Sequence, residues 1–131
     1  MLPATTPVPQ AAPPNKIAAR GLHILATFSA GEALLRDMEG CRACFHQAIA
    51  TLNLHSVGEV FHPFSEAGFT AVVCLTESHA AIHTWPEHGI ATFDVFLSNL
   101  TADNSAKTRR FYDMVIAHFQ ATDIRTTEAV R

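Results

Sequence analysis

Four stretches typical of β-strands follow one another between residues 56 and 97, and this run most restricts what the chain can fold into. They cover residues 56–64, 69–76, 79–84 and 90–97. A short link at 65–68 predicts a hairpin between the first two, and Pro86 and Gly89 supply turn residues between the last two. Short links favour antiparallel pairing, so we expect a mainly antiparallel sheet.

The flanking segments add one strand at each end and two helices. Residues 21–30 predict a strand, and 32–54 repeat apolar side chains at helical spacing, with Gly40 weakening the middle. Residues 106–120 predict a second helix, and 122–130 predict an edge strand. Helices segregated from a run of strands indicate an α+β fold, a two-layer sandwich with two helices on one face of the sheet. The uncovered face leads us to expect a dimer.

Composition favours a single domain. The chain has 131 residues, of which 48% are hydrophobic, enough for one core, and we place the domain at 20–131. Residues 1–19 contain five of the seven prolines and are expected to form a flexible tail. The net charge of −3 gives no reason to expect nucleic acid, and the longest apolar run, 69–75, is too short for a membrane. Since no export signal is visible and the cysteine number is odd, we expect a cytoplasmic protein.

Cys41 and Cys44 have the spacing found in zinc and redox motifs. A zinc site would need a second pair of ligands, and Cys74 stands alone. The helical pattern also turns both residues toward the core. We therefore interpret them as buried packing residues of the helix.

Residues 76–94 crowd histidines, carboxylates, a tryptophan and a serine into one short segment. His79 and His83 would suit a metal on a helix, but their surroundings are rich in β-formers, so we expect no metal. Ser78, His83 and Asp94 could form a hydrolase triad, but Ser78 lacks the Gly-x-Ser-x-Gly turn that would expose its oxygen. Both interpretations are weak, yet the composition still favours a functional site.

This segment contains Glu77-Ser78-His79, Ile82-His83-Thr84-Trp85-Pro86-Glu87, Gly89 and Asp94-Val95-Phe96. It closely resembles the signature of the bacterial and archaeal S-adenosylmethionine decarboxylase proenzymes. Their pattern is Glu-Ser-His-x-x-Ile-His-Thr-(Trp/Tyr)-Pro-Glu-x-Gly, followed by an Asp-Val-Phe strand. A weaker resemblance extends from Gly21 to the C-terminus.

The resemblance implies that the chain cuts itself between Glu77 and Ser78. The Ser78 hydroxyl would attack the Glu77 carbonyl in an N→O acyl shift that gives an ester. Thr70, eight positions before Ser78, stands where the family has a serine hydroxyl that supports this step. His83 would then remove the Ser78 α-proton, so that the ester leaves by β-elimination and Ser78 becomes a pyruvoyl group. The products would be a β chain, 1–77, and an α chain, 78–131.

The resemblance also implies the activity. The pyruvoyl group would form a Schiff base with the amine of S-adenosylmethionine and accept the electrons released as CO₂ leaves, so neither pyridoxal phosphate nor a metal is expected. Glu87 resembles the family carboxylate that contacts the ribose hydroxyls, and Phe61 and Phe64 are candidates for an aromatic wall against adenine. The product would be the aminopropyl donor for spermidine synthesis. The expected assembly is a homodimer of processed αβ units.

Ser98 occupies the position of the family's proton-donating cysteine. Residues 97–99 are Leu-Ser-Asn where the family has Thr-Cys-Gly. A hydroxyl is a poorer acid near neutral pH than a thiol, whose reference pKa is about 8.5. Three interpretations stay open: an S-adenosylmethionine decarboxylase of reduced efficiency, a pyruvoyl decarboxylase of another amino acid such as arginine or ornithine, and a non-catalytic homologue that serves as a partner or binding module.

Overall fold

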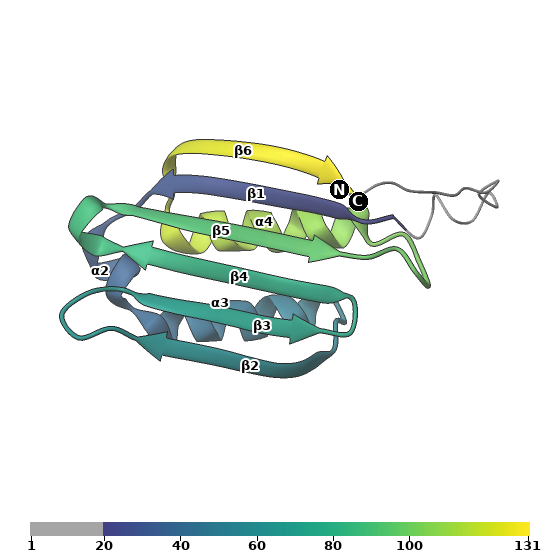
Figure 1. The fold of residues 1–131 in the computed structure, drawn as a ribbon, viewed down its shortest axis with the longest axis horizontal. Coiled ribbons are helices and arrows are strands. Elements are labelled where there is room, and N and C mark those ends of the chain that lie inside the picture. The colour runs from purple at the N-terminus through teal and green to yellow at the C-terminus, as the bar shows by residue number, and fades with distance from the viewer. Residues whose placement is uncertain (1–19) are drawn as a thin grey trace, which may run out of the picture.

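The computed structural model describes residues 20–131, and its framework is one six-stranded sheet. The strands are β1 (Leu22–Ser29), β2 (Ser56–Pro63), β3 (Phe69–Leu75), β4 (Ser78–Trp85), β5 (Ile90–Leu97) and β6 (Thr122–Val130). They lie in the order β2-β3-β4-β5-β1-β6, and every neighbouring pair is antiparallel (Figure 1). The predicted α+β class and the predicted order of the strands along the chain are confirmed. The proline-rich tail predicted at 1–19 lies outside the described residues.

The helices are α2 (Glu32–Arg36), α3 (Met38–Thr51) and α4 (Ser105–Phe119). Figure 1 shows α3 and α4 behind the sheet, so both cover the same face, as predicted. A short 3₁₀ turn, η1 (Pro86–His88), joins β4 to β5, and Gly89 follows it with a φ of 68° that a side chain would disfavour. Among residues 20–131, no helix is long and apolar enough to cross a lipid bilayer.

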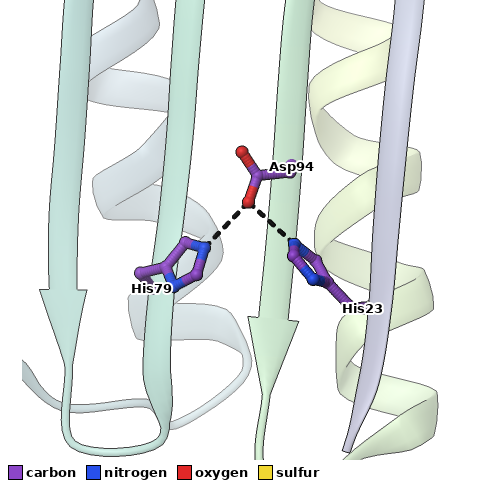
Figure 2. A group of neighbouring side chains, drawn as sticks. All are labelled: His23, His79 and Asp94. Atoms are coloured by element: carbon purple, nitrogen blue, oxygen red, sulfur yellow. Dashed lines mark hydrogen bonds and ion pairs between the residues drawn. The ribbon is translucent and has the colours of Figure 1, made fainter. Parts of the chain in front are cut away.

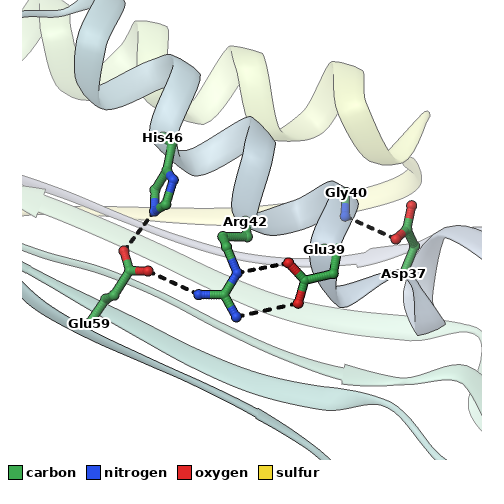
Figure 3. A network of polar contacts seen from close by, with 6 residues as sticks. All are labelled: Asp37, Glu39, Gly40, Arg42, His46 and Glu59. Carbon is green, nitrogen blue, oxygen red and sulfur yellow. Dashed lines mark hydrogen bonds and ion pairs between the residues drawn. The ribbon is translucent and has the colours of Figure 1, made fainter.

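The helix predicted at 32–54 is divided into α2 and α3. The division falls at Asp37, three residues before the glycine that the sequence pointed to. The Asp37 carboxylate accepts a hydrogen bond from the Gly40 N–H at 2.9 Å and thereby caps α3 (Figure 3). A Cβ at Gly40 would collide with this carboxylate. The glycine therefore permits the cap rather than marking the break.

The core lies between the sheet and the helices and is built around phenylalanines. The Phe45 ring on α3 packs against Phe93 of β5 at 5.8 Å and Phe111 of α4 at 5.5 Å between centroids. All three side chains are buried. Replacing such a ring by alanine typically lowers the free energy of unfolding by about 3–5 kcal/mol. The alternating burial of β5 explains why its bounds could be predicted from the sequence.

Cys41 and Cys44 belong to this packing, as interpreted from the sequence. Cys41 is fully buried, and the half-buried Cys44 thiol donates to the Met114 carbonyl at 3.8 Å. Burial raises the pKa of both thiols, that of Cys44 to about 11. Neither thiol is set up as a nucleophile or a ready metal ligand.

Polar contacts attach the edge strand β2 to α3. The Arg42 guanidinium donates to Glu39 of its own helix and to Glu59 of β2, both at 3.0 Å (Figure 3). His46 lies 2.7 Å from the other oxygen of Glu59. These contacts position β2, while the opposite face of the sheet stays uncovered.

We call that uncovered, helix-free side the open face. It presents exposed apolar side chains from several strands: Leu25, Val60, Val72 and Trp85. It also carries the polar side chains His79 and His83 of β4. Every second side chain of a strand points to the same face, so residues 79 and 83 lie on one side of the sheet. The predicted site residues therefore have to be placed relative to this face.

Candidate active site

Ser78 lies where a two-residue turn, Thr76-Glu77, enters β4. Its φ is 149°, a conformation that residues with a side chain rarely adopt. Strain of this kind is worth on the order of 1–3 kcal/mol and persists only when the surroundings enforce it. The strained residue follows the peptide bond that the sequence predicts to be cut.

The carbonyl of that peptide bond already carries a hydrogen bond. The backbone N–H of Ser98 donates to the Glu77 carbonyl at 2.8 Å. Ser98 is fixed in turn by Asn104, a buried residue whose side-chain amide donates to the Ser98 carbonyl at 2.7 Å. The position predicted for the proton donor thus lies beside the Glu77–Ser78 bond, which also gains an aligned donor at its oxygen.

A chain of hydrogen bonds leads away from Ser78 across three strands. The Ser78 hydroxyl lies 3.1 Å from His79 Nδ1, and His79 Nε2 lies 2.8 Å from Asp94 Oδ2. His23 on β1 reaches the same Asp94 oxygen with its Nε2 at 2.9 Å (Figure 2). This is possible because β5, which carries Asp94, lies between β4 and β1. The structure therefore links Ser78 to Asp94 through His79 rather than through the His83 of the triad considered from the sequence.

His23, His79 and Asp94 are also the group, among the described residues, whose three potential metal-ligating atoms lie within 4.8 Å of one another. Both histidine Nε2 atoms lie at ordinary hydrogen-bond distance from a single carboxylate oxygen. The arrangement is thus complete as a hydrogen-bonded cluster without an ion.

A second cluster lies at the other end of β4. Thr70 of β3 is paired with His83 across the sheet, and its hydroxyl is hydrogen-bonded to His83 Nδ1. Both line a cavity of about 370 Å³ whose wall also contains Phe64, Trp85 and Glu87. Four of the predicted site residues, Thr70, His83, Glu87 and Phe64, therefore surround one cavity.

The structure does not bring the two clusters together within one chain. Ser78 and His83 are separated by five residues of an extended strand, about 17 Å at 3.3 Å per residue. Phe61, predicted as part of the adenine wall, instead faces α3. Its ring packs against Phe45 with centroids 6.1 Å apart, and the Arg42 guanidinium carbon lies 4.4 Å from its centre.

Comparisons with known proteins bear on this arrangement. The family model for S-adenosylmethionine decarboxylase matches residues 22–131, the whole of the described fold apart from its first two residues. The chain belongs to the S-adenosylmethionine decarboxylase family.

Its relatives come from bacteria and archaea. It is 40% identical over 97 residues to the S-adenosylmethionine decarboxylase proenzyme of Aquifex aeolicus, covering 73% of this chain and 69% of the relative. The proenzyme of Archaeoglobus fulgidus is 30% identical over 106 residues, covering 80% of this chain and 91% of the relative. The crystal structure of the adenosylmethionine decarboxylase from Aquifex aeolicus VF5 is similar with a TM-score of 0.76 and 33% identity, covering 86% and 91% of the two chains. The resemblance seen in the sequence is confirmed.

The sequence pattern did not single out two members of the cluster in this family fold. His23 had no distinguishing neighbours, and His79 was weighed only as a metal partner of His83. One signal was available, because pairing of residues 78–85 with 90–97 puts His79 and Asp94 on one face. The place of β1 beside β5, which brings in His23, was not predictable in the same way.

Proposed function

We propose that this chain is a proenzyme that cuts itself between Glu77 and Ser78, converts Ser78 into a pyruvoyl group, and then decarboxylates S-adenosylmethionine to the aminopropyl donor for spermidine synthesis. The observation that carries the proposal is the hydrogen bond from the Ser98 N–H to the Glu77 carbonyl, next to the strained Ser78. Family membership supports the same reaction.

The residues at this bond fit the formation of a pyruvoyl group. The precursor must be a serine with its hydroxyl near the preceding carbonyl, and that carbonyl needs a donor for the negative charge it acquires under attack. Ser78 supplies the hydroxyl, and the Ser98 N–H, at 2.8 Å, supplies the donor. Release of the unusual backbone conformation at Ser78 favours cleavage.

Once formed, the pyruvoyl group supplies an electron-withdrawing carbonyl that accepts the electrons freed by loss of CO₂. This chain's own residues hold the substrate and move protons. Glu87 accepts hydrogen bonds from the ribose hydroxyls, and the exposed Phe64 ring lies against adenine. The 370 Å³ cavity is of the size usual for small-molecule sites. Ser98, beside residue 78, stands where a proton must be returned to the substrate carbon.

The separation of the two clusters supports a homodimer in which each site is shared. A two-fold axis that packs two open faces together and runs across the strands would reverse β4 in the second copy. His83, Thr70 and the cavity of the partner subunit would then lie over Ser78. The exposed apolar residues Leu25, Val72 and Trp85 would be buried in this interface. In this assembly His83 of the partner subunit removes the Ser78 α-proton.

The test starts with the intact mass of the purified chain under denaturing conditions. We expect two fragments divided at Glu77/Ser78, the smaller of them, 78–131, with a blocked amino terminus, and release of labelled CO₂ from carboxyl-labelled S-adenosylmethionine. Ser78→Ala is the control and should remain a single chain with no activity. A wild-type chain that stays whole at 14.2 kDa would contradict the proposal. Cleavage with CO₂ release only from arginine or ornithine would retain the pyruvoyl group but overturn the substrate.

A further inference from the structure

The residue that activates Ser78 for the first step can be assigned from the hydrogen-bond cluster of Figure 2. We propose that His79 is the base that takes the proton from the Ser78 hydroxyl in the N→O acyl shift, and that Asp94 positions it. This inference rests on the proposed self-cleavage. It separates the acyl shift from the later removal of the Ser78 α-proton, which stays with His83.

The direction of each hydrogen bond follows from an arginine at the far end of the cluster. An Arg131 guanidinium nitrogen lies 3.3 Å from His23 Nδ1, and a guanidinium can only donate. His23 Nδ1 therefore accepts, which leaves its Nε2–H to donate to Asp94 Oδ2 at 2.9 Å. The carboxylate is thereby held in place from one side.

The same carboxylate fixes the ring of His79. Because Asp94 Oδ2 only accepts, His79 Nε2 carries the proton of their 2.8 Å hydrogen bond. In the neutral ring, Nδ1 then has a lone pair, and this atom lies 3.1 Å from the Ser78 oxygen. A base oriented by a carboxylate and in reach of a hydroxyl is the arrangement that activates serine nucleophiles.

The step balances without any other reactant. The proton moves from the Ser78 hydroxyl to His79 Nδ1 while the oxygen forms a bond to the Glu77 carbonyl carbon. The carbonyl oxygen takes the negative charge and is stabilised by the Ser98 N–H. When the bond from this carbon to the Ser78 nitrogen breaks, His79 returns the proton to that nitrogen. The product is an ester isomer of the chain.

His83 cannot serve the first step from within the same chain, since it lies about 17 Å along β4 from Ser78. His79 is adjacent to Ser78 in the sequence and in hydrogen-bond reach of it. With His79 as its base the acyl shift needs no second copy, whereas the elimination depends on the cavity end of the partner subunit.

The test is to find where cleavage stops in His79→Ala and His79→Gln. Hydroxylamine cuts esters but not amides, so it distinguishes the two steps. We expect the His79 variants to stay whole and to resist hydroxylamine, with cleavage slowed by about 100-fold or more, as is usual for loss of a general base. His83→Ala should also stay whole but be cut by hydroxylamine. Free imidazole should restore part of the cleavage in His79→Ala, which would not follow from a purely structural role.

Cys74→Ala is the matched control, because Cys74 is exposed and lies directly across the β3–β4 hairpin from His79. It should cleave at the wild-type rate. Circular dichroism melts show whether each variant is folded, and His79→Gln, which keeps a polar side chain, carries the test if the alanine variant unfolds. Cleavage of His79→Gln at the wild-type rate, or a stall at the hydroxylamine-sensitive ester, would overturn the role of His79 and leave the proposed function intact. A wild-type chain that never cleaves would overturn the proposed function together with it.

Discussion

The two ends of β4 differ in how complete they are. At the first end, Ser78, His79 and Asp94 form an unbroken series of hydrogen bonds, and the Glu77 carbonyl already has its donor. At the other end, His83 and Thr70 are hydrogen-bonded to each other beside a cavity, and the Glu77–Ser78 peptide bond is far from them in the same chain. One end holds the bond that we propose is cut, and the other holds a cavity that we propose takes the substrate. In the proposed dimer, a single strand would therefore contribute its two ends to two different sites.

The largest effect should come from separating the two ends onto different chains. Ser78→Ala and His83→Ala should each remain whole when expressed alone. Co-expressed, they should form mixed dimers in which the His83→Ala chain has its own Ser78 and meets the intact His83 of the partner subunit. Random pairing puts about half of the His83→Ala chains in such dimers, and these should cleave on a denaturing gel.

The control for this experiment replaces Ser78→Ala by the double variant Ser78→Ala/His83→Ala, which lacks both ends. Cleavage should then disappear again. If the first mixture also stays whole, each site is built within one chain and the proposed sharing is wrong.

The second effect concerns the Ser78 end after cleavage. Ser98→Cys should raise kcat for S-adenosylmethionine by about tenfold or more, because a thiol donates a proton near neutral pH far better than a hydroxyl does. Cleavage should continue, since the substitution leaves the backbone N–H on the Glu77 carbonyl in place. A labelled-CO₂ assay of the processed protein, with Ser98→Ala alongside, measures the change. An unchanged kcat would mean that another group returns the proton.

Some parts of the fold and of the site could be predicted from the sequence and others could not. The limits of β5 were predictable because alternation with period two marks a strand with one buried face. The division of the first helix was not, because Asp37 acts through a cap that only the folded chain shows. The motif gave the cavity end, with His83 and Glu87.

The hydrogen-bonded cluster at Ser78 needed the lateral order of the strands. His23 is far from Asp94 in the sequence and reaches it only because β1 pairs with β5. Periodicity shows which face a side chain occupies but not which strand lies beside it. Phe61 illustrates the converse, since the family resemblance suggested a contact with adenine while its position on β2 turned it toward α3.

A smaller effect is expected at the cavity wall, where Thr84 should contribute to stability rather than to cleavage at Ser78. The buried Thr84 hydroxyl accepts from the Phe69 N–H at 3.0 Å and donates to the Leu35 carbonyl at 2.8 Å. Thr84→Val keeps the shape but leaves both groups without this partner, which should lower the free energy of unfolding by about 1–3 kcal/mol. Urea unfolding of the uncleavable Ser78→Ala chain measures it. Thr92→Val on β5, opposite His83, is the control and should differ little from the parent; an equal loss in both would show that the hydrogen bonds of Thr84 are not the cause.

The smallest expected effect concerns His118. It tests whether the pH dependence of cleavage arises from the histidines of β4 or from unfolding of the protein. Burial of His118 on α4 lowers its pKa, partly offset by the charge of Asp37. In the unfolded chain a histidine has its ordinary pKa of about 6.5, so below that pH the unfolded state takes up the proton more readily than the folded state. The contribution of His118 to the free energy of unfolding should therefore be constant well above pH 6.5. It should decrease as the pH drops from 7.5 to 5.5.

His118→Gln should remove part of this fall, and by a modest amount because the ring is only half-buried. Urea unfolding of Ser78→Ala with and without the substitution, at pH 7.5 and 5.5, measures the difference. The same pH dependence in both chains would show that His118 does not contribute. Since His118 lies on the helix side of the sheet, the substitution should leave the pH profile of cleavage unchanged in the wild-type background. A profile that moved with His118 would mean that cleavage at low pH is limited by unfolding, and the histidines of β4 would then have to be tested only above pH 7.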